Sequence, residues 1–275
     1  MKIVSAGEIL WDIFPGAERL GGAAFNFAVN THRLGHEVLL VSAVGEDDRG
    51  RRALEQMRRI GLSTDFVRIA PRATGVATVA LEAGEPRFTI HRPAAYDLLE
   101  FDPRLIDFRP DWIYFGTLLS MEERAGRVLQ QILTHIPGRC LYDANLRPDS
   151  FTRELAIRLA QRADAIKLTE SELAELGWRI EEIPARFKCV TRGERGCTVI
   201  SGDDRADCGG YRVPVADTVG AGDAFAAAFL HGIDKGWPAA EVGDFANRLA
   251  ALVVSRPGAI PEWTITELEK RPRPV

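Results

Sequence analysis

Short apolar runs without a helical period recur along the chain, and each is followed by a stretch with helical character. The clearest runs lie at residues 2–7, 38–45, 110–116, 139–143 and 165–168. A continuous apolar run is typical of a strand that is covered on both faces, as in parallel sheets. Strands that alternate with helices predict an α/β fold with a mainly parallel central sheet. Because 275 residues can bury one sizeable α/β core, we expect a single domain over residues 1–275.

The pattern changes between residues 65 and 95. Three short strands are predicted in succession, at residues 66–69, 75–81 and 87–91, with a hairpin turn at residues 82–86. A run of strands inside an alternating chain predicts a small β-sheet that stands apart from the main sheet. We expect this small sheet to form from about residues 12–20 and 65–95.

The stretch at residues 217–225 places two glycines between a predicted strand, residues 211–215, and a helical run of small residues, 224–230. Gly220 and Gly222 allow the backbone to turn tightly. Their position predicts a turn that presents free amides at the start of a helix. Free amides and the helix dipole together attract an anion, so the stretch outlines a phosphate site.

An acid stands at the mouth of this predicted phosphate site. The amides of Ala221, Gly222 and Asp223 would hold the charge that develops on a transferred group. A carboxylate that only filled space would repel that group. We therefore interpret Asp223 as the base that takes the proton of an attacking hydroxyl. The alternative is that Asp223 caps the helix, as acids near helix starts often do.

Polar residues also follow the first predicted strand. Asp12 lies just beyond the carboxyl end of this strand, which is where α/β folds bind their ligands. We interpret Asp12 either as a ligand of substrate hydroxyls or as a turn residue. Gly21 and Gly22 can bring the backbone close to a ligand. In the helix that follows them, Asn26 offers a donor and an acceptor to a hydroxyl.

Two later strand ends carry further polar groups. Asp143, Asn145 and Arg147 follow the strand at residues 139–143, and such a mixture fits a site that faces phosphate and metal. Thr169 and Glu172 match the capping-box pattern at the start of a helix.

Charge and cysteine content exclude several classes of protein. The formal net charge is −4, and the lysines and arginines are scattered, so the footprint of a nucleic-acid-binding protein is missing. The sequence shows neither a leader segment nor an apolar run of membrane-spanning length, and we expect a cytoplasmic protein without a membrane partner. The 4 cysteines match no zinc or redox spacing and are expected to be structural.

Two tracts together resemble the signatures of the ribokinase/fructokinase (PfkB-type) family of carbohydrate kinases. They are Gly-Gly-Ala-Ala-Phe-Asn at residues 21–26 and Asp-Thr-Val-Gly-Ala-Gly-Asp-Ala-Phe at residues 217–225. The resemblance implies a ribokinase-like three-layer α/β/α fold with a small β-sheet as a lid over the sugar. It also implies ATP-dependent transfer of the γ-phosphoryl group to a sugar hydroxyl, with Asp223 as catalytic base and an anion hole at Gly220–Asp223.

The resemblance assigns ligands to three groups of residues. Those implied for the sugar are Asp12, Gly21, Gly22, Asn26, Asn145 and Arg147. Those implied for ATP are Lys167, Thr191, Arg192, Gly193, Gly196 and Asn247. Those implied for metal ions are Glu172, for Mg²⁺ through water, and Asp217 with the backbone carbonyls of Val219 and Gly258, for K⁺, which many relatives need.

The acceptor is the part of the reaction that the sequence constrains least. The tracts at residues 7–12 and 143–147 favour fructose or a related ketose. A nucleoside stays open, because Phe14, Phe25 or Phe27 could provide an apolar wall, and so does a 2-keto-3-deoxy sugar acid, because residues 143–147 also resemble the kinases of such acids. The alternative from another class is a sugar-binding regulatory protein without turnover, against which the intact Gly-Ala-Gly-Asp argues. Two copies could pair through the exposed lid sheet.

Overall fold

The computed structural model describes residues 1–82, 85–147 and 151–269. Its main sheet has nine strands in the order β13-β12-β11-β10-β9-β8-β1-β4-β5. The strands are β1 (Lys2–Ala6), β4 (Glu37–Gly45), β5 (Val67–Ala70), β8 (Trp112–Gly116), β9 (Arg139–Asp143), β10 (Ala165–Thr169), β11 (Phe187–Thr191), β12 (Cys197–Ser201) and β13 (Asp204–Cys208). Neighbouring strands from β5 to β11 are parallel, whereas β12 runs antiparallel to both β11 and β13. The predicted mainly parallel sheet is therefore confirmed.

Burial on both faces explains why the strands read as continuous apolar runs. In β1, Ile3 packs in one hydrophobic cluster and Val4 in the other, and both side chains are fully buried. Successive side chains of a strand point to opposite faces of the sheet. Each position of a central strand therefore needs an apolar or small residue, and no alternation survives in the sequence.

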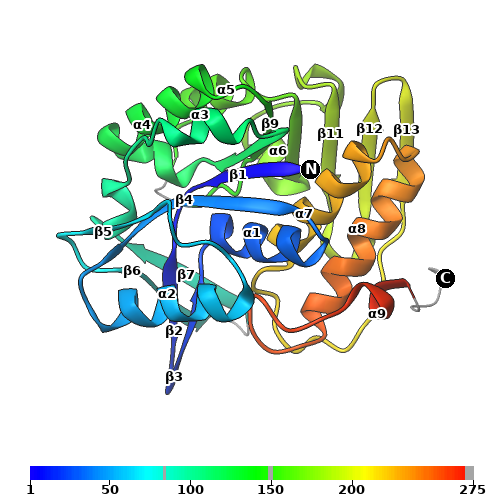
Figure 1. Cartoon of the computed structure of the whole chain (residues 1–275). Coiled ribbons are helices and arrows are strands. Elements are labelled where there is room, and N and C mark those ends of the chain that lie inside the picture. The colour runs from blue at the N-terminus through cyan, green and yellow to red at the C-terminus, as the bar shows by residue number, and fades with distance from the viewer. Residues whose placement is uncertain (83–84, 148–150, 270–275) are drawn as a thin grey trace.

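Helices cover both faces of the main sheet (Figure 1). One face is covered by α1 (Ala23–Arg33), α2 (Asp48–Ile60), α7 (Ala221–Asp234), α8 (Ala239–Val254) and α9 (Ile265–Glu269). The other face is covered by α3 (Arg104–Phe108), α4 (Glu123–His135), α5 (Arg153–Ala160) and α6 (Glu170–Glu175). Short 3₁₀ helices are η1 (Ala95–Leu98), η2 (Leu118–Met121), η3 (Ile180–Glu182) and η4 (Gly193–Arg195). The three-layer α/β/α architecture is thus confirmed.

A second sheet of four strands stands at one end of the main sheet, toward the lower left of Figure 1. Its order is β3-β2-β6-β7, formed by β2 (Leu10–Phe14), β3 (Ala17–Gly21), β6 (Gly75–Glu82) and β7 (Glu85–His91). We call this sheet the lid sheet. The turn predicted at residues 82–86 includes residues 83–84, which lie outside the described part of the chain.

The predicted extent of the lid was wrong at one strand. Residues 65–70 were assigned to the lid, but β5 pairs in parallel with β4 at the edge of the main sheet. The chain passes from β4 through α2 to β5, and the short apolar strand buries Val67 in the main core. A βαβ crossover of this kind returns a strand to the same sheet, which a count of consecutive short strands does not detect.

The strand predicted at residues 211–215 was also wrong, because that segment forms neither strand nor helix. Pro214 has no amide hydrogen to offer a neighbouring strand, and Val215 is 68% exposed. The next amides, those of Ala216 and Asp217, donate to the Val254 carbonyl at the end of α8, at 2.9 and 3.2 Å. The segment is therefore attached to a helix end and leads directly into α7.

Small side chains let α7 pack closely between α1 and α8. Ala224, Ala226, Ala227 and Ala228 are fully buried in the core on this face. Helices with small residues at their contact can approach closely, and this docking fixes the direction in which α7 begins. Its N-terminus consequently faces the junction between the main sheet and the lid sheet.

Candidate active site

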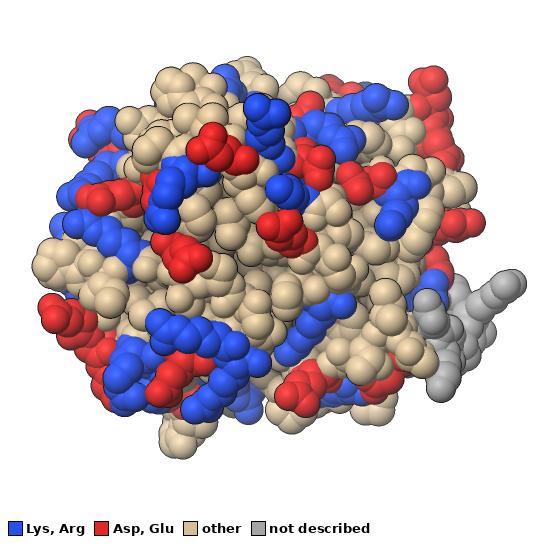
Figure 2. All heavy atoms as spheres, in the orientation of Figure 1, with Lys and Arg blue, Asp and Glu red and all other residues tan. Residues whose placement is uncertain are grey.

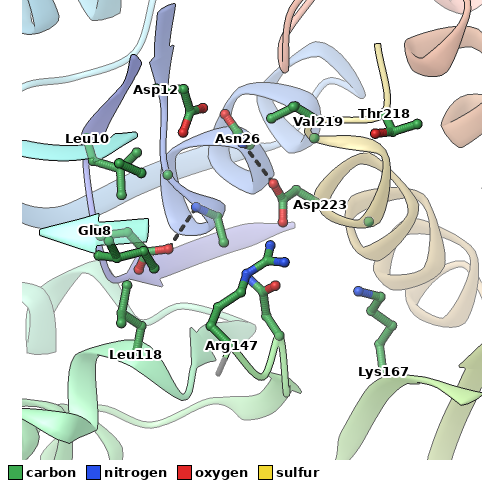
Figure 3. Close-up of a pocket in the computed structure, with 17 residues that line it drawn as sticks. Glu8, Leu10, Asp12, Asn26, Leu118, Arg147, Lys167, Thr218, Val219 and Asp223 are labelled. Atoms are coloured by element: carbon green, nitrogen blue, oxygen red, sulfur yellow. Dashed lines mark hydrogen bonds between the residues drawn. The ribbon is translucent and has the colours of Figure 1, made fainter. Parts of the chain in front are cut away.

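A cavity of about 300 Å³ lies between the lid sheet, the N-terminus of α7 and the carboxyl ends of β9 and β10 (Figure 3). The residues that line it are Glu8, Leu10, Asp12, Gly22, Ala23, Asn26, Ala77, Ile90, Leu118, Asn145, Arg147, Lys167, Thr218, Val219, Gly220, Gly222 and Asp223. The two glycine tracts, about two hundred residues apart in the sequence, meet at this cavity. Most of the residues predicted for the sugar and for the anion hole are among its walls.

The turn into α7 depends on glycine for two different reasons. Gly220 has φ 79°, and a Cβ at this residue would lie 2.2 Å from the Ala259 carbonyl oxygen. A Cβ on Gly222 would lie 3.1 Å from Nζ of Lys167. The first amides of the helix have no intrahelical acceptor, and Gly222 and Asp223 line the cavity, whereas the Ala221 amide makes a long bond, 3.4 Å, to the Thr218 carbonyl. The turn is therefore suited to hold an anion.

Asp223 lies in the first turn of α7 and is turned toward α1 (Figure 3). Its Oδ2 accepts a hydrogen bond of 2.8 Å from Nδ2 of Asn26. Burial raises the pKa of Asp223, while the Asn26 hydrogen bond and the charges of Lys167 and Arg147 act to lower it. A buried carboxylate with a raised pKa is more basic than a carboxylate in water and can accept a proton from a hydroxyl.

Asn26 joins the base to the substrate side of the cavity. Its Oδ1 is buried and has no hydrogen-bond partner among the described residues. An unpaired buried acceptor is costly, and a donor from a bound molecule would satisfy it. Asn26 can therefore accept a hydrogen bond from a hydroxyl while its amide group holds Asp223.

Two buried acids line the end of the cavity near the lid sheet. Burial raises the pKa of Glu8 to about 7, and Oε1 of Glu8 accepts a bond of 2.8 Å from the Ala23 amide. Burial, followed by the charge of Asp223, raises the pKa of Asp12 to about 7. Both groups can accept hydrogen bonds from several hydroxyls of one ligand.

The glycines before α1 make room for these acids. A Cβ on Gly21 would lie 2.7 Å from Oδ2 of Asp12, and one on Gly22 would lie 2.5 Å from the Glu8 carbonyl oxygen. Gly22 also has φ 108°. Larger residues here would push Asp12 or the chain at Glu8 out of place.

The loop after β9 brings Asn145 and Arg147 to the opposite wall of the cavity. Asn145 has φ 40°, a conformation that asparagine tolerates better than most residues. The amide of Leu146 donates to Oε1 of Glu172 at 2.7 Å, which holds the loop. In Figure 3 the guanidinium of Arg147 points toward Asp223.

A buried ion pair stands beside the anion hole. Nζ of Lys167 donates to Oδ1 of Asp143 at 2.9 Å, and both side chains are almost completely buried. Burial acts to lower the pKa of Lys167, but the negative charges of Asp143 and Glu172 together have a larger effect in the opposite direction, so the pKa is raised. Burial raises the pKa of Asp143 to about 6, although Lys167 acts to lower it. Lys167 therefore stays positively charged next to Gly222.

Of the residues predicted for the nucleotide, Lys167 lines this cavity, whereas the others lie away from it, at the turn between β11 and β12 and on α8. Arg192 donates to the Thr198 hydroxyl at 2.7 Å, and the Arg192 amide donates to the Gly196 carbonyl at 2.7 Å. Nδ2 of Asn247 donates to the Gly209 carbonyl at 3.0 Å. Thr191 and Gly193 belong to the same strand end and turn. Thr169 at the end of β10 is paired with Thr191, so this turn lies on the same edge of the sheet as the cavity.

Glu172 completes the predicted capping box at the start of α6. Its Oε2 accepts from the Thr169 amide at 2.7 Å, and the Thr169 hydroxyl accepts from the Glu172 amide at 3.2 Å. Because Oε1 bonds the Leu146 amide, each carboxylate oxygen has a backbone donor. The charge of Glu172 nevertheless contributes to the pKa values of Lys167 and Asp143.

The three residues predicted for a potassium ion are brought together before and after the last long helices. Asp217 accepts from the amides of Val219 and Gly258, each at 3.0 Å. The Asp217 carboxylate also accepts a hydrogen bond from Arg19 of β3. Arg19 was not anticipated as a functional residue.

Sequence reasoning also missed Glu8 and the apolar side chains from around the lid. Leu10, Ala77, Ile90 and Leu118 line the cavity, and none of them stands in a distinctive motif. Glu8 adjoins Gly7 at the end of the first strand, and its place before Asp12 could have marked it. The apolar residues could not be identified because they come from four separate elements, β2, β6, β7 and η2, that only the fold brings together.

Comparison with known proteins shows that the sequence is similar to those of sugar kinases. Residues 16–265 match a family model described as "pfkB family carbohydrate kinase". A putative sugar kinase of Pyrococcus horikoshii is 32% identical over 94% of this chain and 91% of its own length. Fructokinase-1 of rice (Oryza sativa subsp. japonica) is 29% identical over 97% of this chain and 95% of its own length.

A solved structure supports the same relation at the level of the fold. The crystal structure of an uncharacterized sugar kinase from Pyrococcus horikoshii in complex with ATP is 26% identical, with a TM-score of 0.86. The superposition covers 98% of this chain and 97% of that chain. Both the main sheet and the lid sheet therefore have counterparts in a protein that binds ATP.

Proposed function

The chain belongs to the pfkB family of carbohydrate kinases and is an ATP-dependent sugar kinase, and we propose that its acceptor is fructose or a related ketose. In this proposal Asp223 is the catalytic base and the turn at Gly220–Asp223 is the anion hole. The observation that carries the proposal is the position of Asp223, which is held by Asn26 at the helix N-terminus inside the cavity. Relatives named fructokinases favour fructose.

The roles of the residues follow from their positions. Asp223 takes the proton from the attacking hydroxyl, whose oxygen then forms a bond to the γ-phosphorus while the bond from phosphorus to the leaving ADP oxygen breaks. The first amides of α7, with Lys167 and Arg147, offset the negative charge of the transferred group. Asn26 and Asp12 orient the sugar, and Gly21 and Gly22 keep the space for it.

The charges around the cavity fit a divalent cation that accompanies the nucleotide. Five acids interact electrostatically with one another or with Lys167 and Arg147. They are Glu8, Asp12, Asp143, Glu172 and Asp223. Burial raises the pKa values of Glu8, Asp12, Asp143 and Asp223. Such a surplus of buried carboxyl groups is what a bound Mg²⁺ would offset. We propose Glu172 as its ligand through water, with Mg²⁺ screening the phosphate charge when bound.

The substrate wall favours a neutral, polyhydroxylated acceptor. Glu8 and Asp12 supply hydrogen-bond acceptors, and their ionised forms would repel the carboxylate of a sugar acid. The cations that line this cavity, Arg147 and Lys167, are the ones assigned above to the transferred group (Figure 3). A ketose is therefore favoured over a 2-keto-3-deoxy sugar acid, and a nucleoside remains the enzyme alternative that the experiment below includes.

The remaining assignments are proposals of the same kind. We propose that ATP binds beyond the carboxyl end of β11, next to that of β10. The residues proposed for it are Thr191, Arg192, Gly193 and Gly196 at the turn after β11, and Asn247 on α8, which bonds the Gly209 carbonyl. Pairing of two copies through the lid sheet and a cytoplasmic location stay predictions from the sequence. The lid order leaves β3 and β7 as its two edges. Among the described residues, no helix is long and apolar enough to cross a membrane.

Turnover of ATP to ADP tests the proposal directly. Ketoses, aldoses, sugar acids and nucleosides are compared as acceptors with Mg²⁺ present, for the natural protein and for Asp223→Asn. We expect turnover with fructose or a related ketose, and a loss of about 10²–10⁴-fold in Asp223→Asn because the base is removed.

Asp234→Asn is the matched control, because Asp234 lies at the other end of α7 and accepts bonds from Trp112 and Arg139. It should keep its activity. A preference for nucleosides or sugar acids would overturn the acceptor assignment. No turnover with any acceptor, while a sugar still raises the melting temperature, would point to a binding protein without catalysis.

A further inference from the structure

The carboxylate of Asp217 ties together two loops that meet at the anion hole. Its Oδ1 accepts from the Val219 amide and its Oδ2 from the Gly258 amide, each at 3.0 Å. Val219 precedes the turn into α7, and Gly258 follows the end of α8. Asp217 thus holds the loop before the anion hole against the loop after α8.

The position of the anion hole depends on this contact between loops. A Cβ at Gly220 would lie 2.2 Å from the Ala259 carbonyl oxygen, so the turn rests directly on the residue after Gly258. Displacement of either loop would move the first amides of α7. Stabilisation of a transition state depends on hydrogen-bond donors that are already held in place. The pairing of the Asp217 carboxylate therefore affects the anion hole, although Asp217 does not contact the substrate.

The group that balances Asp217 comes from the lid sheet. Nη1 of Arg19, in β3, donates to Oδ2 of Asp217, which also bonds Gly258. The side chain of Asp217 is 11% exposed, and the guanidinium of Arg19 lies 5.1 Å from the Phe14 ring centroid. A Cβ at Gly258 would lie 3.8 Å from Cδ of Arg19, so the arginine side chain passes over this loop.

The contacts of the Asp217 carboxylate do not fit the potassium ion that the resemblance implies for Asp217 and the backbone carbonyls of Val219 and Gly258. A mobile cation would have to compete with a tethered guanidinium for a carboxylate that already has three donors. A guanidinium linked to the same chain loses less translational freedom on pairing than a free ion does on binding. The sole carboxylate among the three residues predicted for the ion is therefore already paired.

We propose that Arg19 is a built-in cation that takes the place of a monovalent metal ion beside the anion hole. Arg19 is a positioning residue in this role, because it acts on the anion hole through Asp217. The role of Arg19 in catalysis rests on the proposed function, whereas the ion pair between Arg19 and Asp217 does not. Two consequences follow: the natural protein needs no K⁺, and removal of the Arg19 charge creates a site that K⁺ can fill.

Thermal unfolding without substrates tests the pairing. The natural protein, Arg19→Met and Arg19→Gln are compared in about 100 mM KCl and in choline chloride of equal ionic strength. We expect no K⁺-specific shift for the natural protein, and a K⁺-specific rise in melting temperature of about 2–4 °C for both variants. A K⁺-specific rise in the natural protein, or none in either variant, would overturn the proposal.

Two further variants separate the proposal from a general effect of charge. Arg49→Met is the matched control, because Arg49 has the same exposure, 41%, and pairs with Glu18 instead of Asp217. It should show no K⁺ response. Arg19→Met combined with Asp217→Asn should lose the response gained by Arg19→Met, since the carboxylate that binds the ion is gone.

Kinase assays test whether Arg19 affects catalysis. We expect the turnover of the natural protein to be the same in the two salts. Arg19→Met should lose at least about tenfold in kcat in choline chloride and recover most of it in KCl, with a smaller change in KM for the acceptor. A kcat of Arg19→Met that is low and equal in both salts would contradict the role of Arg19 as a replaceable cation. Failure of the proposed acceptor would leave the unfolding result unaffected.

Discussion

Asp223 and Asn26 show how one hydrogen-bonded pair can serve both the base and the substrate. Asn26 donates to Asp223 through Nδ2 and keeps its Oδ1 unpaired and buried within the described part of the chain. The first bond stabilises the ionised carboxylate and opposes the effect of burial on its pKa. A substrate hydroxyl that donates to Oδ1 would complete the hydrogen bonding of the amide.

Asn26→Ala should move the acid limb of the pH profile of kcat to higher pH. Without the hydrogen bond, burial raises the pKa of Asp223 further, so the base is protonated at a higher pH. Because a hydrogen bond to a charged group contributes about 1.5–3 kcal/mol, the limb should move by about 1–2 pH units. A pH series of initial rates at saturating substrates measures the shift.

Asn30→Ala is the control for this change, because Asn30 lies one turn further along α1 and bonds Trp263 and the Asn26 carbonyl. It should lower the melting temperature and leave the acid limb in place. An acid limb that stays unchanged in Asn26→Ala would show that Asn26 does not control the ionisation of the base.

At the scale of the element, α7 carries the chemistry at one end and is buried along most of its length. Residues 224–233 are all buried, and the helix packs against α1 and α8. Its N-terminus is defined by Gly220, whose φ of 79° no β-branched residue would tolerate. The helix is therefore a fixed support from which the amides of the anion hole project.

Gly220→Ala should abolish most activity, whereas Gly236→Ala should not. Both glycines flank α7 at positive φ, 79° and 69°, so alanine at either residue should cost about 1–2 kcal/mol of folding stability. Only at Gly220 would the added Cβ meet backbone, because nothing lies within 4 Å of a Cβ at Gly236. Melting temperatures and kcat of the two variants give the comparison.

We expect kcat of Gly220→Ala to fall by about 10²-fold or more, since the turn and its amides must move away from Ala259. Gly236→Ala should lower the melting temperature by a few degrees and leave kcat near that of the natural protein. Equal losses of kcat in both variants would mean that backbone strain, and not the contact with Ala259, is the cause.

At the scale of the whole molecule, the site is a concentration of buried acids between two sheets. Most charged groups lie on the surface, where both signs are interspersed on the face that Figure 2 presents. Glu8, Asp12 and Asp143 are instead buried, and Glu8, Asp12 and Asp223 line the cavity where the lid sheet meets the main sheet. Burial raises the pKa of each of these carboxyl groups.

The ligand-free protein should become more stable as the pH falls from about 8 to about 6.5. A carboxyl group whose pKa is about 7 in the folded state binds a proton that the unfolded chain, with a pKa near 4, has released. Each such group adds up to about 1.4 kcal/mol of stability per pH unit as the pH falls through this range. Thermal unfolding over a pH series measures the slope.

Glu8→Gln and Asp12→Asn should each flatten this slope, and Glu123→Gln, at an exposed position of α4, should not. Below about pH 6.5 the buried pair His36 and His231 lowers the stability of the folded protein as the pH falls. Burial lowers the pKa of His36 to about 4 and lowers that of His231, so the unfolded chain binds protons at a higher pH than the folded protein does. Stability that rises with pH between 6.5 and 8 would contradict the assignment of the buried acids.

Much of the fold could be predicted because its signals are local. The apolar runs predicted β1, β4, β8, β9 and β10. The pairing of β5 and the path of residues 211–215 could not be predicted. Both depend on hydrogen bonds to distant segments, β4 in one case and the end of α8 in the other.

The sequence by itself determined the class of fold, the family and the two glycine tracts, because apolar periodicity and tight turns depend on residues close together in the chain. Only the tertiary structure decided which groups share the cavity and in what state of charge. Glu8 becomes a site residue through burial against Ala23, and Arg19 becomes the partner of Asp217 through the fold of the lid sheet. The physical reason is that pKa values and ion pairs depend on distances and burial between residues up to about two hundred positions apart.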